Sequence, residues 1–404
     1  MKGSIRMKIL VLNAGSSSLK YQLFNMETGM VLAKGLCERI GAGGTITHKK
    51  TGDEPFFEEI ELPDHGVALG KVLGLLDSEE HGVIADIKEI DAVGHRVAHG
   101  GEKCRESTKI TESVIKYLES IVPINPLHGP PAIAGIRACS ELMPDTPQVA
   151  VFDTSFYSGI EDFRYIYPIP YEFYEKDGVR RFGFHGTSHR YVSASLARQL
   201  GKPLEELKII TCHLGNGSSI TAVENGKAID TSMGFTPQEG IIMGTRSGSI
   251  DPTVVTYLMK LKGYTPEQME DILNKKSGLL GVSGLSNDCR NLTQAAETGN
   301  ERAALALKIM VNGIKRYIGS YIAEMNGLDA LVFTAGIGEN QVNIRHDVCK
   351  DMDYLGIKID EDKNRNFTRG VPFDISADGA KVRTWIIPTD EEYMIALDTK
   401  QLAF

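Results

Sequence analysis

The chain has 404 residues, of which 42% are hydrophobic, and a net charge of −9. This length and apolar content favour two or more buried cores, and the acidic balance gives no global field that would attract nucleic acid or anionic lipid. The six cysteines have no CxxC spacing, no apolar run reaches the ~20 residues of a membrane helix, and the start is too short and polar for a signal peptide. We therefore expect a cytoplasmic protein that binds neither nucleic acid nor membrane.

The first elements in chain order are predicted to be three strands in a meander. Residues 8–12 form a short apolar run rich in β-formers, a second β-type run covers 19–24, and a third begins at Val31 after a glycine turn.

The same meander is predicted again in the second half of the chain. Residues 208–212 and 219–223 are β-type runs, and Asn225-Gly226 is a strong hairpin signal. The two meanders start 208 − 8 = 200 residues apart, with Gly15 and Gly215 in register.

A second repeat has the same order. Residues 91–94 and 329–333 both read as a buried strand that leads into a glycine-rich loop. Two repeats in the same order indicate a duplicated domain.

Helices are predicted between the strands. Residues 189–200 carry apolar side chains at helical spacing, with Thr187 or Ser188 as the N-cap, and residues 301–325 are Ala/Leu/Ile-rich and free of proline.

The expected architecture is α/β, with two related lobes that each contain a mixed sheet flanked by helices. We place the N-terminal lobe at 1–155 and the C-terminal, nucleotide-binding lobe at 156–384. The tail, 385–404, reads as a strand, a cap at Pro388-Thr389 and a helix, and is expected to pack back on the first lobe.

Three glycine-rich stretches at predicted strand ends are candidate nucleotide loops. Residues 13–20 offer backbone N–H groups, serine hydroxyls and Lys20 to a polyphosphate, without P-loop spacing. Residues 213–219 lie at the equivalent place in the second half, where glycine lets amides approach an anion. Residues 334–340 suit a ribose and base, and their spacing is not that of a dinucleotide-binding fold. Each stretch alone is also compatible with an ordinary turn, but we expect the first two to face one cleft.

These loops on a duplicated meander resemble the superfamily of actin, heat-shock chaperone ATPases and sugar kinases, whose fold is ribonuclease H-like. Within it the chain resembles the acetate kinase family of short-chain acyl kinases. The motifs run in family order through most of the chain: Asn-x-Gly-Ser-Ser-Ser-x-Lys (13–20), Gly-His-Arg-Val-x-His-Gly-Gly (94–101), Gly-Phe-His-Gly-Thr-Ser-His (183–189), His-x-Gly-Asn-Gly (213–217), Met-Gly-Thr-Arg-Ser-Gly (243–248), Thr-Ala-Gly-Ile-Gly-Glu-Asn (334–340) and Pro-Thr-x-Glu-Glu (388–392).

The resemblance implies a homodimeric kinase that transfers the γ-phosphoryl group of ATP directly, in line and reversibly to acetate, giving acetyl phosphate and ADP. A propionate kinase with the same mechanism and an actin- or chaperone-like ATPase are the alternatives.

A carboxylate acceptor makes particular demands on the site. Carboxyl groups ionise near pH ~4, so the acceptor needs no general base, but two anionic reactants need cationic neutralisation. The resemblance implies that Arg96 binds the acyl carboxylate and that Arg246 and His185 stabilise the transferring phosphoryl group. Asp153 corresponds to the family's catalytic aspartate, and positioning Arg96 or a Mg²⁺-bound water is as plausible a role for it as base catalysis.

The resemblance also assigns the remaining site residues. Asn13 and Glu391 would hold Mg²⁺, with Mn²⁺ as a substitute, and Glu391 also suits the dipole at the start of the last helix. The substrate site would consist of Arg96, Ala98, Leu127, His128, Phe184 and Pro237. The ATP or ADP site would consist of Ser16, Ser18, Lys20, His213, Leu214, Gly215, Asn216, Gly217, Asp288, Cys289, Arg290, Gly336, Ile337, Gly338, Glu339 and Asn340.

Some positions depart from the family pattern. Gly129 and Asp390 each replace an asparagine, and Cys289 stands where the family often has an aromatic residue. Ala98 stands where the family often has valine, which leaves room for about one more acyl carbon. Because one methylene changes discrimination by only ~1–3 kcal/mol, we expect appreciable activity with propionate.

Overall fold

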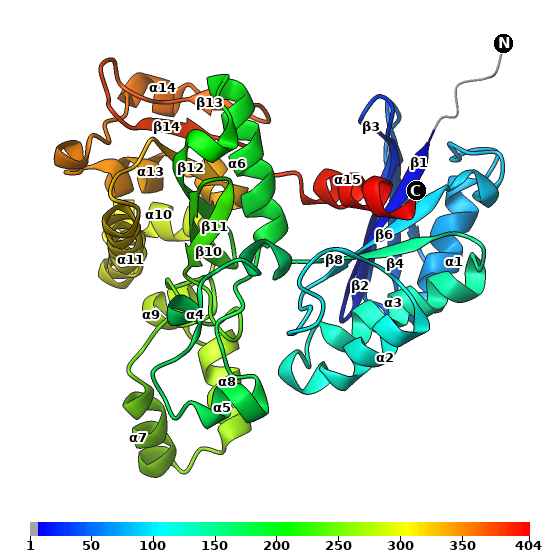
Figure 1. The fold of residues 1–404 in the computed structure, drawn as a ribbon, viewed down its shortest axis with the longest axis horizontal. Helices are drawn as coiled ribbons and strands as arrows, with labels where there is room; N and C mark the ends of the chain where they lie inside the picture. Colours follow the sequence, from blue (N-terminus) through cyan, green and yellow to red (C-terminus); the bar gives the residue numbers. More distant parts are fainter. Residues whose placement is uncertain (1–6) are drawn as a thin grey trace. The chain divides into compact units, whose positions relative to one another are not determined.

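The computed structural model describes residues 7–404, so the first six residues, for which no signal peptide is predicted, lie outside the described residues. The described chain divides into two compact units. Unit 1 comprises residues 7–155 and 390–404, and unit 2 comprises residues 156–389 (Figure 1). Each unit contains one mixed sheet flanked by helices, which confirms the predicted α/β class.

Unit 1 is built on a sheet with the order β5-β4-β3-β2-β1-β6-β8-β7. The strands are β1 (Lys8–Gly15), β2 (Ser18–Asn25), β3 (Met30–Glu38), β4 (Thr45–Lys50), β5 (Phe56–Glu59), β6 (Ala92–Val97), β7 (Thr108–Lys109) and β8 (Gln148–Phe152). The helices are α1 (His65–Leu76), α2 (Glu112–Ser120), α3 (Gly129–Leu142) and α15 (Glu391–Ala403).

Side-chain alternation along β1 explains how this sheet is covered. Leu10 and Leu12 pack with residues of α1 and α3, whereas Ile9 and Val11 pack with Ile395 of α15. Successive side chains of a strand point to opposite faces, so a strand buried on both sides reads as a continuous apolar run. The helix at the end of the chain therefore completes the core of unit 1 (Figure 1).

Unit 2 is built on a sheet with the order β11-β10-β9-β12-β14-β13. The strands are β9 (Lys208–Leu214), β10 (Ser218–Glu224), β11 (Lys227–Thr231), β12 (Ala330–Thr334), β13 (Phe373–Asp374) and β14 (Arg383–Ile386). The helices are α4 (Asp162–Tyr165), α5 (Glu172–Asp177), α6 (Gly186–Leu200), α7 (Pro252–Lys262), α8 (Pro266–Lys275), α9 (Gly278–Ser283), α10 (Cys289–Glu297), α11 (Glu301–Met325), α12 (Ala335–Asn340), α13 (Val342–Cys349) and α14 (Glu361–Arg365). Ile210 and Cys212 of β9 pack toward α11, and Ile209 packs toward α6.

The two sheets share one topology. The order β3-β2-β1-β6-β8-β7 in unit 1 matches β11-β10-β9-β12-β14-β13 in unit 2, with the same sequence of antiparallel and parallel pairings. A detail at the strand starts is also shared. The amide of Lys8 donates to Asp91 Oδ2 and that of Lys208 donates to Asp329 Oδ2, both at 2.7 Å.

The candidate loops differ in structure from the sequence prediction. Strands β1 and β2 join through the two-residue turn Ser16-Ser17, so most of the first predicted loop is β-hairpin. Residues 335–340 form helix α12 instead of a loop.

Two predicted element ends are also corrected. Thr187 and Ser188, the predicted N-caps, lie inside helix α6. The N-cap is His185, at φ 59°. The predicted tail begins too early, since β14 pairs with β12 in the sheet of unit 2 and unit 1 resumes only at Asp390. The cap of α15 is Asp390, which accepts from the amide of Tyr393, and not Pro388-Thr389.

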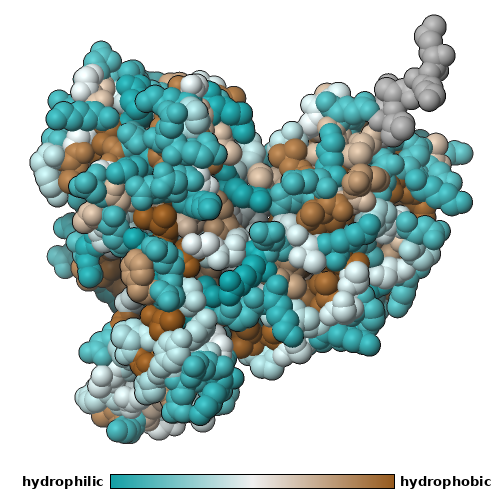
Figure 2. Space-filling view, in the orientation of Figure 1, coloured by the Kyte–Doolittle hydropathy of each residue, from teal (hydrophilic) through white to brown (hydrophobic). Residues whose placement is uncertain are grey.

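All six cysteines are buried free thiols, three in each unit. Among the described residues, no helix has the length and apolarity needed to cross a bilayer. The face shown in Figure 2 is mostly hydrophilic, with scattered hydrophobic patches.

Candidate active site

In unit 1, three predicted site residues come together where parallel strands end. Asn13 lies near the end of β1, Arg96 lies within β6, and Asp153 follows β8 directly. Arg96 was expected to follow its strand, but it is paired in the sheet opposite Val151. The carboxyl ends of adjacent parallel strands are a common place for ligands, because side chains from several strands converge there.

Arg96 and Asp153 form a partly buried ion pair with two hydrogen bonds. Arg96 Nη2 donates to Asp153 Oδ2 at 2.6 Å and Nε donates to Oδ1 at 3.3 Å. The carboxylate raises the pKa of Arg96, so the guanidinium stays charged at any working pH. Arg96 Nη1 also donates weakly to Asn13 Oδ1 at 3.4 Å.

Glu391, in the first turn of α15, is the second acidic group beside Arg96. Burial raises its pKa, the Arg96 charge lowers it, and the Asp153 charge raises it. Its Oε1 atom is buried and has no hydrogen-bond partner. A buried carboxylate oxygen without a partner is the feature that a bound cation would satisfy, so Glu391 with Asn13 fits the predicted magnesium site. Among the described residues, no cluster of three or more His, Cys, Asp or Glu side chains is arranged to hold a metal.

The other predicted site residues of unit 1 differ in their contacts and exposure. Lys20 pairs with Glu392, and Ser16 is exposed at the hairpin turn. Ala98 is 8% exposed, whereas Leu127 is 56% exposed. Ser18 lies in β2, and His128 directly precedes α3.

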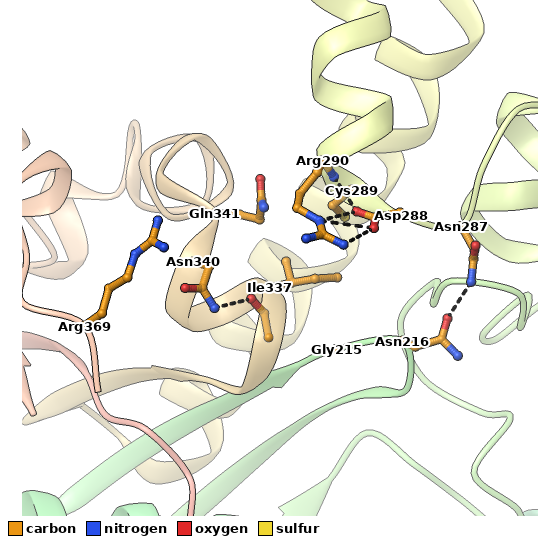
Figure 3. A pocket seen from close by; sticks show the side chains of 11 residues that line it. Gly215, Asn216, Asn287, Asp288, Cys289, Arg290, Ile337, Asn340, Gln341 and Arg369 are labelled. Atoms are coloured by element: carbon orange, nitrogen blue, oxygen red, sulfur yellow. Dashed lines mark hydrogen bonds and ion pairs between the residues drawn. The ribbon is translucent and has the colours of Figure 1, made fainter. Parts of the chain in front are cut away.

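Unit 2 contains a cavity of about 630 Å³ (Figure 3). Eight of the predicted nucleotide residues line it: Gly215, Asn216, Asp288, Cys289, Arg290, Gly336, Ile337 and Asn340. They come from three places in the chain, namely the turn after β9, the start of α10 and helix α12. Arg290 Nη2 donates to Asp288 Oδ2 at 2.6 Å, and this pair lies beside Ile337 in Figure 3.

Three residues that line the cavity were not predicted from the sequence: Asn287, Gln341 and Arg369. Asn287 Nδ2 donates to Asn216 Oδ1 at 3.1 Å, which links the start of α10 to the turn after β9. Arg369 lies at the far side of the view from Asn216 in Figure 3. The available signal was the adjacent motif 334–340 for Gln341 and the adjacent assigned residue Asp288 for Asn287, and Arg369 gave none.

The remaining predicted nucleotide residues do not line this cavity. Leu214 is fully buried, and Gly338 packs against β12. Burial raises the pKa of Glu339, whose Oε1 accepts from the amide of Thr389 at 3.4 Å. His213 and Gly217 lie instead at the second cluster of unit 2, which contains His185 and Arg246.

His185 and Arg246 both approach Gly217. A Cβ atom built on Gly217 would lie 3.4 Å from His185 Nε2 and 3.5 Å from Arg246 Nη1. The His185 ring stacks on that of His213 with centroids 4.2 Å apart. The missing side chain of Gly217 therefore leaves space next to two nitrogen donors.

Arg246 is a half-buried cation that no carboxylate of the described residues neutralises. Its Nη1 atom donates to the Pro237 carbonyl at 3.1 Å, and burial lowers its pKa. A guanidinium in such surroundings has capacity left for an anionic ligand. Phe184, a predicted acyl contact, is buried with Met233 and Met243 beside this loop.

Unit 2 has a nucleotide-sized cavity and an arginine that no carboxylate of the described residues compensates, and unit 1 has a strand-end Arg–Asp pair. Each of these features suits the binding of charged phosphoryl or carboxylate groups, as in a kinase. A sequence profile of the Acetokinase family matches residues 8–397. The chain therefore belongs to the acetokinase family.

Individual relatives agree with this assignment. The acetate kinase of Caldanaerobacter subterraneus subsp. tengcongensis is 56% identical over 98% of this chain and 99% of its own length. The crystal structure of Porphyromonas gingivalis acetate kinase is 47% identical with a TM-score of 0.94, covering 98% of this chain and all of that one. A propionate kinase from Francisella tularensis is 40% identical with a TM-score of 0.91, covering 98% of this chain and all of that one.

Proposed function

We propose that this protein transfers the γ-phosphoryl group of ATP to acetate, reversibly, giving acetyl phosphate and ADP. Membership of the acetokinase family supports a carboxylate as the acceptor. The observation that carries the proposal is the arrangement of Asp153, whose two oxygens both accept from Arg96. A hydroxyl acceptor must lose its proton to a general base, whereas an ionised carboxylate acceptor has no proton to lose. A carboxylate acceptor therefore fits a site in which Asp153 is engaged by Arg96.

The roles of the residues follow from charge. Arg96, held by Asp153, binds the carboxylate of acetate and weakens its repulsion from the nucleotide. Arg246 and His185 donate to the oxygens of the transferring phosphoryl group, where negative charge must be stabilised in the transition state. Since no proton has to be removed from the acceptor, the rate depends on positioning and electrostatics.

A magnesium ion, when bound, neutralises charge on the phosphates. Glu391 and Asn13 would hold it, because Glu391 offers a buried oxygen with no other partner. Asn216 is proposed to contact the phosphates and Asp288, Arg290, Ile337 and Asn340 the adenosine, since these residues line one cavity. Both units are proposed to serve one reaction, with Arg96 of unit 1 binding acetate and the cavity of unit 2 binding ATP.

Hydroxylamine trapping tests the proposed reaction. With ATP, Mg²⁺ and acetate, the protein is expected to form acetyl hydroxamate, because hydroxylamine captures acyl phosphates. ATP hydrolysis without hydroxamate would instead indicate the alternative of an actin- or chaperone-like ATPase. The variant Arg246→Ala is expected to lower the rate of hydroxamate formation by at least about 10²-fold, because it lacks a donor to the transferring phosphoryl group.

Propionate is proposed as a second acceptor. Ala98 is small and 8% exposed, and a propionate kinase is among the similar structures. The trapping assay with acetate, propionate and butyrate gives the preference as a ratio of kcat/KM values. A ratio for propionate many orders of magnitude below acetate would contradict this part of the proposal.

A homodimer is proposed from the family resemblance, and an apolar stripe on α7 is the surface proposed for it. Val254, Tyr257 and Leu261 are spaced as one helical face and are 42%, 59% and 57% exposed. A second copy of the chain is the proposed cover for this face. Sedimentation equilibrium is expected to give a dimer that Leu261→Glu weakens and the control Thr256→Glu does not.

The six free thiols support a cytoplasmic location.

A further inference from the structure

Behind His185 lies a chain of buried polar side chains that no proposed role explains. Helix α6 covers one face of the unit 2 sheet, and the strand register brings Thr211 of β9 and Ser219 of β10 to that face. His189, one turn after His185 on α6, lies between them. Thr211, Ser219 and His189 are all fully buried.

The distances define a continuous hydrogen-bonded chain. Ser219 Oγ lies 2.8 Å from His185 Nδ1 and 2.8 Å from His189 Nε2. His189 Nδ1 lies 2.6 Å from Thr211 Oγ1. The order of the chain is therefore Thr211, His189, Ser219, His185.

When each group donates to one neighbour and accepts from the other, the chain has two possible proton arrangements. A hydroxyl has one proton, and a neutral imidazole donates from one nitrogen and accepts at the other. In the first arrangement Thr211 donates to His189, His189 donates to Ser219, and Ser219 donates to His185 Nδ1. A neutral His185 then carries its proton on Nε2.

The second arrangement is the reverse, in which His185 Nδ1 donates to Ser219, Ser219 donates to His189, and His189 donates to Thr211. It suits an imidazolium at position 185, which has protons on both nitrogens. Burial lowers the pKa of His189 far below its usual value, so His189 stays neutral in either arrangement. The first arrangement leaves an N–H on His185 Nε2, the atom that approaches Gly217 beside Arg246, and the second does so when His185 is an imidazolium.

We propose that Ser219, supported by His189 and Thr211, is a positioning residue that holds the His185 ring with its Nε2–H directed at the transferring phosphoryl group. This inference rests on the proposed role of His185 in phosphoryl transfer. The backbone of His185, at φ 59°, is in a region that non-glycine residues seldom adopt, which is consistent with a side chain held in one orientation by its surroundings.

A double-mutant cycle separates positioning from a structural role. Ser219→Ala is expected to lower kcat about tenfold, with the KM values for acetate and ATP changed less than about twofold, because only the orientation of a transition-state donor is lost. In a His185→Ala background the same substitution is expected to have no further effect on kcat. Losses that multiply in the double variant would show a general structural role and overturn the proposal.

Further variants keep the test decisive. Thr211→Val removes the hydroxyl at the far end of the chain with little change of shape, and a smaller loss of kcat is expected, again only when His185 is present. Ser193→Ala is the matched control, because Ser193 is equally buried on α6 and its hydroxyl donates to the His189 carbonyl at 2.7 Å, outside the Thr211–His189–Ser219–His185 chain. It is expected to retain full kcat.

The outcomes distinguish this inference from the proposed function. Absence of acetyl hydroxamate from the wild-type protein would reject the reaction itself. Full kcat in His185→Ala would reject the role of His185. Full kcat in both Ser219→Ala and Thr211→Val, with His185→Ala impaired, would overturn the positioning role alone.

Discussion

Arg96 Nη2 and Nε reach the two oxygens of Asp153 at 2.6 and 3.3 Å, so the guanidinium and the carboxylate face each other as a fork. Both groups are largely enclosed in unit 1, and Asp153 is the carboxylate that hydrogen-bonds to Arg96. Removing one partner of a buried pair leaves the other charge unpaired.

Asp153→Asn is expected to raise the KM for acetate about tenfold or more and to lower the thermal unfolding midpoint, because Arg96 loses its charged partner. The KM for ATP is expected to stay within about twofold, since the residues that line the nucleotide cavity belong to unit 2. Steady-state kinetics with each substrate varied separately checks this. A variant with normal acetate KM and reduced kcat alone would favour a direct catalytic role for Asp153.

Glu391→Gln is expected to stabilise the protein above neutral pH while abolishing its use of Mg²⁺. The raised pKa of Glu391 means that the native state holds the proton more tightly than the unfolded chain does. Stability therefore falls as pH rises from the ordinary glutamate pKa to the raised one, and a neutral amide avoids this loss. In metal-free buffer at pH 8 the unfolding midpoint is expected to rise by about 2 °C or more. The gain should disappear near pH 4, and its persistence there would contradict the charge explanation.

Gly217→Ala is expected to lower kcat without unfolding the protein. The added methyl group would contact His185 and Arg246 at about 3.4–3.5 Å, an ordinary packing distance, but it would fill the space that phosphoryl oxygens need. The expected loss of kcat is about 10²-fold. Circular dichroism and the unfolding midpoint provide the check on folding, and an unchanged kcat would place the reacting group elsewhere.

Arg369→Ala is expected to raise the KM for ATP about tenfold, the effect of losing one charge-assisted hydrogen bond. Arg369 lines the cavity of unit 2, and the KM for acetate should not change. Arg365→Ala is the control, because Arg365 is in the preceding helix and pairs with Asp362 without lining the cavity. Equal effects of the two substitutions would point to surface charge instead of a specific contact.

Ala98→Val is expected to shift acceptor preference toward acetate. The added methyl groups reduce the room for the second carbon of the acyl tail, so the propionate-to-acetate ratio of kcat/KM should fall about tenfold. Hydroxamate formation with both acids measures the ratio. An unchanged ratio would remove Ala98 from the acyl pocket.

The strand meanders and the long helix were predictable from the sequence because local patterns determine them. Helix α11 occupies the predicted residues 301–325, and β1 through β3 follow the predicted runs. The repeat spacing also predicted that the two sheets share one topology. Both copies keep an aspartate whose carboxylate accepts from the backbone amide at the start of the first strand.

Helix α12 was missed because residues outside the helix stabilise it. Gly336 and Gly338 disfavour a helix, which made a loop the reasonable prediction. The buried Arg345 donates to the carbonyls of Gly338 and Glu339, both at 2.9 Å, and so satisfies the end of this short helix. Gly338 also lies close against Phe333, where a Cβ atom would be 3.3 Å from the Phe333 carbonyl carbon.

The cap of α6 was misplaced for a similar reason. Ser188 looked like an N-cap, but its hydroxyl is engaged by His213 and Thr389, which are distant in the sequence. Arg369 could not be found either, because a single loop arginine has no pattern until the fold places it on a cavity.

The buried cysteines can be used to measure local opening of each unit separately. Cys37, Cys104 and Cys139 belong to unit 1, and Cys212, Cys289 and Cys349 belong to unit 2. A thiol reagent reaches a sealed sulfur only when the surrounding structure opens, so mapping which three sulfurs are labelled first in mild denaturant would rank the opening free energies of the two halves. Added nucleotide is expected to slow the labelling of the three cysteines of unit 2 more than that of the three cysteines of unit 1.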